Sequence, residues 1–371
     1  MAVLHFKNSM RSLAALPWLF IEKAGFDSGT NYPIKYVVEK KSWSVKWDGL
    51  QICDQINTLQ PKQAKISTNP ERLIGSVAHF GSQFLWQNWC EHISKSNKIV
   101  VSFFHGKRSD NAEMSRHIDF FLDKLSSIDR VVVANTIVEK RMRTWGVPSE
   151  KVIRIPIGVD TNLFRPPKKN EKTNARKRFG IGKDSIVIGS FQKDGVGWGD
   201  GLEPKWIKGP DQFVCVVEKL SKKFPVHVLL TGPARGFVID LLKKKNILFT
   251  HHYAKNYSDL VQAYHALNLY LVTSREEGGP KALLESLATG VPVISYDVGM
   301  ASDLFRETGA GLIVNVEDVE MMVEKAEGLL FDALLREKIV KSGSKIIEQF
   351  DWKWIAKTHY EMVYQPLLRE G

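Results

Sequence analysis

The stretch Ser274–Val293 reads SREEGGPKALLESLATGVPV. It follows the apolar run 269–273, which is typical of a buried strand, and its second half has the apolar spacing of a helix from about Lys281 to Thr289. Gly278–Pro280 precede that helix: the glycines let a ligand approach the backbone, and proline suits the first helical position. The amides ahead of the helix then carry a partial positive charge, which suits a phosphate or a sugar hydroxyl.

Two acidic residues lie in this stretch, Glu277 in the loop and Glu285 in the helix. Helical side chains lean toward the N-terminus, so Glu285 is expected to point back toward the loop, where Glu277 reaches the same volume. Two carboxylates beside bare amides suit the hydroxyls of a nucleotide sugar. The same spacing equally fits an exposed Lys281–Glu285 pair and an ordinary loop acid at Glu277. Spacing alone leaves the two interpretations about even.

Short apolar runs alternate with helical patterns through most of the chain. Near-continuous β-branched runs indicate strands that are buried on both faces, and hence parallel sheets covered by helices. The strands predicted in this way are residues 99–104, 130–134, 186–190, 226–230, 269–272 and 292–295. In open parallel sheets ligands bind beyond the carboxyl ends of the strands, which is where residues 274–280 fall.

The clearest break in the pattern is the proline-rich and charged stretch 164–174. Such a composition is typical of an interdomain linker, and 371 residues suit two domains of ordinary size. We therefore predict an N-terminal domain of residues 1–166, a linker of residues 167–179 and a C-terminal domain of residues 180–353.

Residues 274–293 resemble the signature of the retaining GT-B glycosyltransferases, family 4 in particular. In that signature two glutamates, here Glu277 and Glu285, are separated by seven residues, and a Leu-Glu-small-x-Ala-x-Gly-x-Pro-Val run overlaps the second. Shorter matches follow in the family's order at residues 146–164, 208–211, 231–233 and 350–352. The resemblance implies an α/β fold with two Rossmann-like domains whose parallel sheets face each other across a cleft. It also implies a C-terminal helix, residues 354–371, that crosses back to the first domain.

The resemblance assigns roles to individual residues. Glu285 would bind the ribose hydroxyls of the donor, Glu277 the transferred sugar and Lys208 the diphosphate. The family has an Arg several residues before that Lys; here Lys193 is the preferred substitute and Lys205 the alternative.

Further site residues follow from the same resemblance. Backbone ahead of the helix would hold the sugar and phosphate, a second glycine turn would lie nearby, an aromatic ring would stack on the base, and a histidine of the first domain would contact the donor sugar. These residues are Gly278, Gly279, Pro280, Lys281, Gly232, Tyr257 and His105. We take His105, Glu277 and Lys208 as the catalytic set. Without the resemblance, packing accounts for Tyr257 as well, a solvated charge accounts for Lys193, and a structural role accounts for His105.

The beginning of the chain departs from the family, whose members open with a strand and a glycine-rich loop. Residues 1–31 contain no clear counterpart, and the nearest glycine-bearing strand exit is Phe80–Gln83. The apolar run Leu13–Ile21 is shorter than the ~20 residues that span a bilayer, contains Pro17, and is not followed by a small-residue cleavage site. We expect it to be a core or domain-surface segment, with a membrane-touching segment as the alternative.

The composition of the chain limits the cellular compartment and the kinds of partner that we expect. The three cysteines (Cys53, Cys90, Cys215) are isolated in the sequence, which favours a reducing compartment and hence the cytoplasm. The formal charge of +11 fits a nucleic acid, an anionic membrane surface or a phosphate-bearing substrate. No interleaved aromatic and basic motif of the known modules occurs, so we predict no nucleic-acid partner.

These observations predict a cytoplasmic enzyme, peripheral on the inner membrane face, that transfers sugar from a UDP- or GDP-linked donor to a saccharide or lipid-linked acceptor. No Asp-x-Asp motif is present, and neither a metal nor another cofactor is expected. Three alternatives remain at this point: a nucleotide-sugar epimerase or phosphorylase-like enzyme on the same architecture, a basic nucleic-acid-binding protein, and an inactive family member that acts as a partner subunit.

Overall fold

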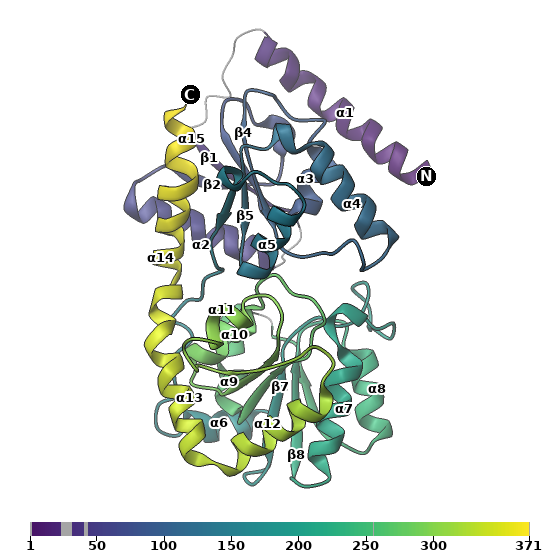
Figure 1. Ribbon diagram of the computed structural model, residues 1–371, viewed down its shortest axis with the longest axis vertical. Coiled ribbons are helices and arrows are strands. Elements are labelled where there is room, and N and C mark those ends of the chain that lie inside the picture. Colours follow the sequence, from purple (N-terminus) through teal and green to yellow (C-terminus); the bar gives the residue numbers. More distant parts are fainter. Residues whose placement is uncertain (1, 24–31, 41–43, 255, 371) are drawn as a thin grey trace. The chain divides into compact units, whose positions relative to one another are not determined.

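The computed structural model describes residues 2–23, 32–40, 44–254 and 256–370, with side chains from Ser9 onward in the first of these ranges. The chain divides into two compact units (Figure 1). Unit 1 comprises Met1–Gly158 and Trp352–Gly371, and unit 2 comprises Val159–Asp351.

Unit 1 is built on a parallel sheet of six strands in the order β2-β1-β3-β4-β5-β6. The strands are β1 Ile34–Val37, β2 Ala64–Ser67, β3 Val77–Phe80, β4 Lys98–Phe103, β5 Arg130–Val133 and β6 Val152–Arg154. The predicted strands 99–104 and 130–134 are confirmed as β4 and β5. The sheet begins at residue 34, and the described part of residues 1–31 contains a helix instead of the strand with which the family opens.

Alternate residues of each strand of unit 1 face opposite helical layers, as the two-residue period of a strand requires. Val100 and Val132 face one core cluster, which includes Ile355 and Tyr364 from the end of the chain, whereas Val101 faces the other. The helices are α1 Ala2–Lys23, α2 Ser44–Leu59, α3 Gln83–Trp89, α4 Ala112–Asp123, α5 Thr136–Thr144, α14 Trp352–His359 and α15 Gln365–Arg369. Short 3-10 turns are η1 Pro70–Arg72, η2 Leu125–Ser127 and η3 Ser149–Lys151, and a π-helical turn, η7 Tyr360–Tyr364, joins α14 to α15.

The return of the chain end to the first domain is confirmed. Trp352 and the residues after it belong to unit 1, where α14 packs against α2 (Figure 1). The helix begins at Trp352, two residues earlier than predicted. Gly158 allows this packing, because a Cβ on it would lie 2.5 Å from the Trp352 ring.

Unit 2 repeats the design with a second parallel sheet of six strands in the order β12-β11-β10-β7-β8-β9. The strands are β7 Ile186–Ser190, β8 Val226–Thr231, β9 Leu248–His252, β10 Leu269–Val272, β11 Val293–Tyr296 and β12 Leu312–Val314. All four strands predicted here are confirmed, as β7, β8, β10 and β11. The expectation of two parallel α/β domains is therefore correct.

The helices of unit 2 cover its sheet. They are α6 Glu171–Arg178, α7 Pro210–Ser221, α8 Gly236–Lys244, α9 Leu260–Ala266, α10 Lys281–Ala288, α11 Ala301–Phe305, α12 Val319–Phe331 and α13 Ala333–Ile346. The 3-10 turns are η4 Trp206–Lys208, η5 Tyr257–Asp259 and η6 Ile347–Phe350.

The stretch predicted as a linker has a different structure. Residues 167–179 lie within unit 2 and contain α6, which packs against α9. Arg165 makes two hydrogen bonds of 2.8 Å to Glu171, and Ala175 and Phe179 are buried. The charges that indicated a solvated linker are therefore paired or lie on the outer side of a docked helix, and the unit boundary falls at Gly158–Val159 instead of residue 166.

The apolar run Leu13–Ile21 is part of α1, a helix on the surface of unit 1. Ala15 is buried there, whereas Leu13, Leu16 and Phe20 are exposed. Within the described residues, no helix combines the length and the apolar character that crossing a membrane requires.

Candidate functional site

The stretch at the end of β10 folds as a strand, a loop and a helix. Pro280 is the residue before the helix, with φ −68° and ψ 106°, so α10 begins at Lys281 and proline is not its first helical residue as predicted. Gly290, with φ 72°, follows the end of the helix, and its N–H donates to the carbonyl of Leu287. The loop amides ahead of Lys281 therefore precede a regular helix, the arrangement that favours an anion.

Glu277 is held by two side chains, one from its own loop and one from a distant segment. Its Oε1 accepts hydrogen bonds from Ser274 Oγ at 2.8 Å and from Lys208 Nζ at 2.6 Å, and the residue is only 8% exposed. It is therefore not an ordinary loop acid. Lys208 lies 69 residues away in sequence, yet the two charges form a nearly buried pair.

Gly209 allows Lys208 to reach Glu277. Its φ of 59° is in the left-handed region, and a Cβ on it would lie 1.9 Å from the carbonyl oxygen of Thr273. The Gly209 carbonyl in turn accepts a hydrogen bond of 3.0 Å from Thr273 Oγ1. Only glycine allows so close an approach, so Gly209 holds the Lys208 turn against the end of β10.

Glu285 is buried in α10, with 4% of the residue exposed. The hydroxyl of Tyr264 donates to its Oε2 at 2.5 Å, and the hydroxyl of Tyr257 donates to its Oε1. Burial and then the negative charge of Glu285 raise the pKa of Tyr264 well above its ordinary value. The exposed Lys281–Glu285 pair on a helix surface is thus excluded, and Tyr257, predicted to stack on a base, is bound to the carboxylate beside it.

Lys205 lies near Lys208, Glu277 and Lys193. Burial, together with the positive charges of Lys208 and Lys193, lowers the pKa of Lys205, whereas the negative charge of Glu277 acts in the opposite direction. The ammonium of Lys193 also lies 4.4 Å from the centroid of the Trp198 ring. Lys205 therefore lies within electrostatic range of Lys208, the predicted diphosphate residue, and Lys193 lies within electrostatic range of Lys205.

Lys193 and Lys205 lie at the two ends of an insertion, residues 193–205, that folds back on itself. Val196 N–H donates to Glu203, Lys205 N–H donates to Asp194, and Gly195 pairs with Pro204. A buried ion pair fixes the insertion to unit 2, because Arg235 Nε lies 2.9 Å from Asp194 Oδ1 and both side chains are almost fully buried. The insertion is thereby tied to the turn that follows β8.

The remaining predicted residues fall in both units. Gly232 follows β8 with φ 84°, and its carbonyl lies 2.8 Å from His251 Nε2. His105 lies in unit 1, just beyond β4, where its carbonyl accepts a hydrogen bond of 2.9 Å from Gln83. Unit 2 thus brings Lys193, Lys208, Glu277 and Glu285 to the carboxyl edge of its sheet, whereas the role of His105 stays a prediction.

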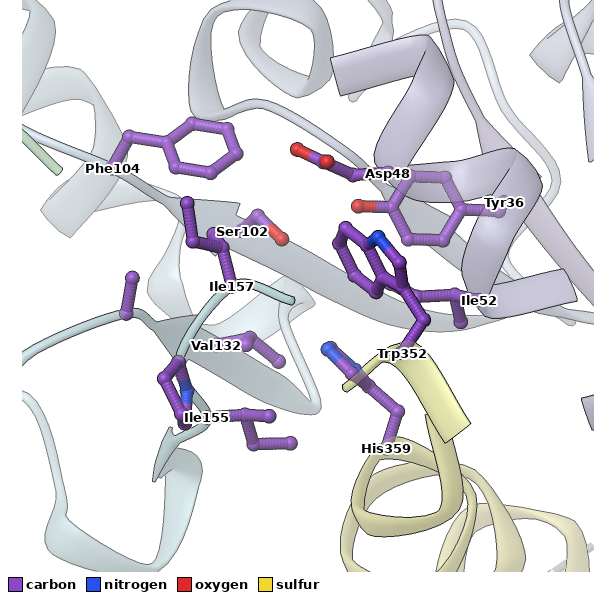
Figure 2. Close-up of a pocket in the computed structure, with 12 residues that line it drawn as sticks. Tyr36, Asp48, Ile52, Ser102, Phe104, Val132, Ile155, Ile157, Trp352 and His359 are labelled. Carbon is purple, nitrogen blue, oxygen red and sulfur yellow. The ribbon is translucent and has the colours of Figure 1, made fainter. Parts of the chain in front are cut away.

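Two hollows occur elsewhere. A groove in unit 2 is lined by residues of α6, α9 and the segment before α6, and a small pocket in unit 1 is lined by residues that include Tyr36, Asp48, Ser102, Trp352 and His359. Figure 2 shows the Asp48 carboxylate and the hydroxyls of Tyr36 and Ser102 directed toward this second space. Its free volume of about 30 Å³ has room for no more than a few water molecules. Neither hollow is lined by Glu277 or Glu285.

Four features of the site were not foreseen from the sequence. Ser274 and Gln192 bond within it, since Gln192 Nε2 donates to the Lys208 carbonyl at 3.0 Å. Tyr264 and the Arg235–Asp194 pair support it from the core. Arg235, between Gly232 and Gly236 in the turn after β8, was the one sequence feature that could have indicated such a contact. The other contacts join residues that no local sequence pattern connects.

Known proteins share this sequence pattern and this fold. Residues 202–346 match the family described as "Glycosyl transferases group 1". The chain is 30% identical over 185 residues to the lipopolysaccharide core biosynthesis mannosyltransferase LpsB of Rhizobium meliloti. The matched region covers 47% of this chain and 49% of that protein. It is 27% identical over 261 residues to the D-inositol 3-phosphate glycosyltransferase of Acidothermus cellulolyticus, 66% of this chain and 54% of that protein. The chain spans about half the length of the curated relatives it matches.

Solved structures match over nearly the whole chain. The sucrose-phosphate synthase of Thermosynechococcus elongatus has a TM-score of 0.71 at 16% identity, and the match covers 92% of this chain and all of that one. HepE of Anabaena, solved in complex with UDP-glucose, has a TM-score of 0.71 at 14% identity over 90% of this chain and 99% of that one. The chain therefore has the GT-B fold, and its residues 202–346 match the model of the group 1 glycosyl transferases.

Proposed function

We propose that this protein is a retaining glycosyltransferase of family 4 that needs no metal ion and moves a sugar from a nucleoside diphosphate to an acceptor hydroxyl. The observation that carries the proposal is the cluster at the carboxyl edge of the unit 2 sheet. There Lys208 meets the stretch that contains Glu277, the amides ahead of α10 and Glu285, so two segments 69 residues apart come together. Relatives named for lipopolysaccharide and capsular polysaccharide synthesis support a role in polysaccharide or glycolipid assembly.

The donor binds by its charges and its hydroxyls. Lys208, Lys193 and Lys205 and the loop amides neutralise the diphosphate, because positive groups already in position stabilise charge without reorganisation. Glu277 accepts hydrogen bonds from the transferred sugar, and Glu285 accepts them from the ribose. Complexes of HepE with UDP-glucose support a UDP-linked donor, with a GDP-linked donor as the alternative.

The transfer step breaks the bond between the anomeric carbon and the diphosphate oxygen and forms a bond from that carbon to the acceptor oxygen on the same face. The acceptor proton passes to the departing diphosphate, whose negative charge grows as the bond breaks. Lys208 and the amides ahead of α10 stabilise that growing charge. His105 contacts the donor sugar from unit 1, and the acceptor is a saccharide or lipid-linked hydroxyl at the inner face of the cytoplasmic membrane.

The binding half of the proposal is tested by thermal unfolding of the full chain with UDP, GDP and their sugars. A bound nucleotide raises the free energy of unfolding by mass action, by about 2.7 kcal/mol at one hundred times its Kd, and the melting temperature rises with it. Lys208→Ala and Glu285→Gln should weaken the shift, whereas Lys222→Ala and Glu320→Gln, which change exposed residues, should not. If no nucleotide stabilises the protein, the proposal fails.

The chemical half is tested with the stabilising donor and a panel of saccharide and lipid-linked acceptors. The anomeric configuration of the product, read by NMR, should equal that of the donor, and EDTA should leave the rate unchanged. An inverted product, or activity that disappears with EDTA and returns with a divalent cation, would contradict the corresponding part of the proposal.

A further inference from the structure

Helix α1 contacts the rest of unit 1 through polar and aromatic side chains. The Arg11 guanidinium lies 5.5 Å from the centroid of the Trp89 ring, and the Arg72 guanidinium lies 5.5 Å from that of Trp18. The carboxylate of Glu22 accepts a hydrogen bond from Ser94. The side of α1 that faces the protein therefore carries Arg11 and Glu22.

The opposite side of α1 is apolar and faces solvent. Met10, Leu13, Leu16 and Phe20 are 57%, 66%, 58% and 74% exposed. Their spacing of three, three and four residues puts them on one arc about 120° wide at 100° per residue. Figure 1 shows α1 running along the outside of unit 1.

This orientation is the reverse of that of an ordinary surface helix, whose apolar side faces the core and whose charged side faces water. Single exposed apolar residues are common on protein surfaces, but a continuous stripe of large ones marks a surface that binds something. The contacts of Arg11, Trp18 and Glu22 hold the helix in this orientation, so the stripe is presented outward.

The charge of the chain is concentrated in the unit that carries α1. Unit 1 contains 25 Lys and Arg against 16 Asp and Glu, whereas unit 2 contains 27 against 25. Lys23, the last residue of α1, is exposed. Arg72, whose side chain is 57% exposed, lies beside α1 at Trp18. An apolar stripe accompanied by cations is the composition of a helix that lies in the plane of an anionic lipid surface.

We propose that α1 seats unit 1 on an anionic lipid surface, with Met10, Leu13, Leu16 and Phe20 in the boundary between headgroups and acyl chains. A second copy of the chain is a poorer occupant for two reasons. A dimer through α1 would bring two units with the same positive excess together, and one face of a single helix offers little of the ~1,000 Å² that a stable interface needs. This proposal is independent of the proposed transferase activity.

The test is co-sedimentation of the full chain with two kinds of vesicle, one of phosphatidylcholine alone and one of phosphatidylcholine mixed with phosphatidylglycerol. We expect binding to the mixed vesicles that falls as salt is added, because screening weakens attraction to the anionic surface. The triple variant Leu13→Ser, Leu16→Ser, Phe20→Ser should bind the mixed vesicles about tenfold more weakly or worse, since it removes most of the buried apolar area.

The matched control is Phe331→Ser with Leu334→Ser, which removes two equally exposed apolar side chains (73% and 78%) from unit 2. It should bind vesicles as the unchanged chain does. All of these residues are exposed, so both variants should keep the melting temperature of the parent. Equal binding by the triple variant, or no preference for anionic vesicles, would overturn the proposal. So would a dimer in light scattering that the triple variant abolishes while vesicles are not bound, because the stripe would then join two copies.

Discussion

Arg235→Met should destabilise unit 2 far more than any exposed arginine substitution. The guanidinium is fully buried, lies 2.9 Å from Asp194 Oδ1, and donates to the carbonyls of Ser190 at 2.7 Å and Thr231 at 2.9 Å. Removing one partner of a buried pair typically costs about 3–5 kcal/mol, because the other charge stays buried without compensation. Burial already raises the pKa of Asp194 while Arg235 opposes that rise, so in the variant Asp194 can take up a proton and limit the loss. We therefore expect a loss of about 3–4 kcal/mol.

The assay is differential scanning calorimetry of the full chain. For a domain of this size 1 kcal/mol shifts the melting temperature by about 2–4 °C, so the unit 2 transition should move down by about 10 °C. The control is Arg306→Met, because Arg306 pairs with Asp297 but is 61% exposed, and its loss should change stability by less than about 1 kcal/mol. If Arg235→Met moves the transition no more than Arg306→Met does, the Arg235–Asp194 pair is not what holds the 193–205 insertion.

The same pair also has a functional consequence. The insertion supplies Lys193 and Lys205, so Arg235→Met should weaken the stabilisation by nucleotide as well as lower the melting temperature of the free protein. Arg306→Met should leave the nucleotide response unchanged. A variant that loses stability but keeps full nucleotide affinity would separate the two effects and contradict the role given to the insertion.

Three further predictions concern single residues. Tyr257→Phe should bind the stabilising nucleoside diphosphate at least as tightly as the parent in calorimetry, because the Tyr257 hydroxyl now occupies the Glu285 oxygen that a ribose would use; weaker binding would contradict this. Gly209→Ala should remove most of the nucleotide response, since its Cβ would lie 1.9 Å from the Thr273 carbonyl and its φ is 59°; an unchanged response in the thermal assay would mean that the turn is dispensable. Burial lowers the pKa of His359 to about 3 from its usual 6.5. As the pH falls below 6.5, this histidine therefore binds a proton in the unfolded chain but stays neutral in the folded one. The contribution of this group to the unfolding free energy should therefore be constant above pH 7 and drop by about 2 kcal/mol between pH 7 and 5. Urea titrations across this pH range check the sign and the size, and the unfolding free energy of His359→Gln should depend less steeply on pH than that of the parent.

The central strands of both sheets could be predicted because they are buried on both faces. Runs such as 186–190 and 226–230 are almost continuously apolar, and a short run of that kind between helical patterns is typical of a buried parallel strand. The strands that were missed are short or lie at edges. β9, LFTHH, is half-exposed, and β1, IKYV, contains a lysine that the fold buries completely. The histidines of β9 and the lysine of β1 interrupt the continuous apolar runs from which the other strands were predicted.

The candidate site was predictable only where its residues are neighbours in sequence. The loop-to-helix stretch 274–293 contains the two glutamates, and the helical periodicity predicts where each lies along the chain. The periodicity did not decide between an exposed and a buried position for Glu285, and the structure buries that side of α10: Glu285 and Thr289 are only 4% and 1% exposed. Tyr264 meets Glu285 across 21 residues, and Lys208 meets Glu277 across 69. Those contacts arise from sheet order, which no single segment encodes.

The placement of residues 352–371 in unit 1 has a consequence for how the chain is made. Tyr36, Val100 and Val132 face a layer that α14 and the residues after it complete, and a ribosome reaches those residues only after it has synthesised all of unit 2. Unit 2 is continuous in sequence and can fold as soon as it has been synthesised. The sheet of unit 1 is synthesised first, but one of its faces stays incompletely covered until the last helices are made. A premature stop near the end of translation would therefore damage the domain that was made first and spare the one that was made later.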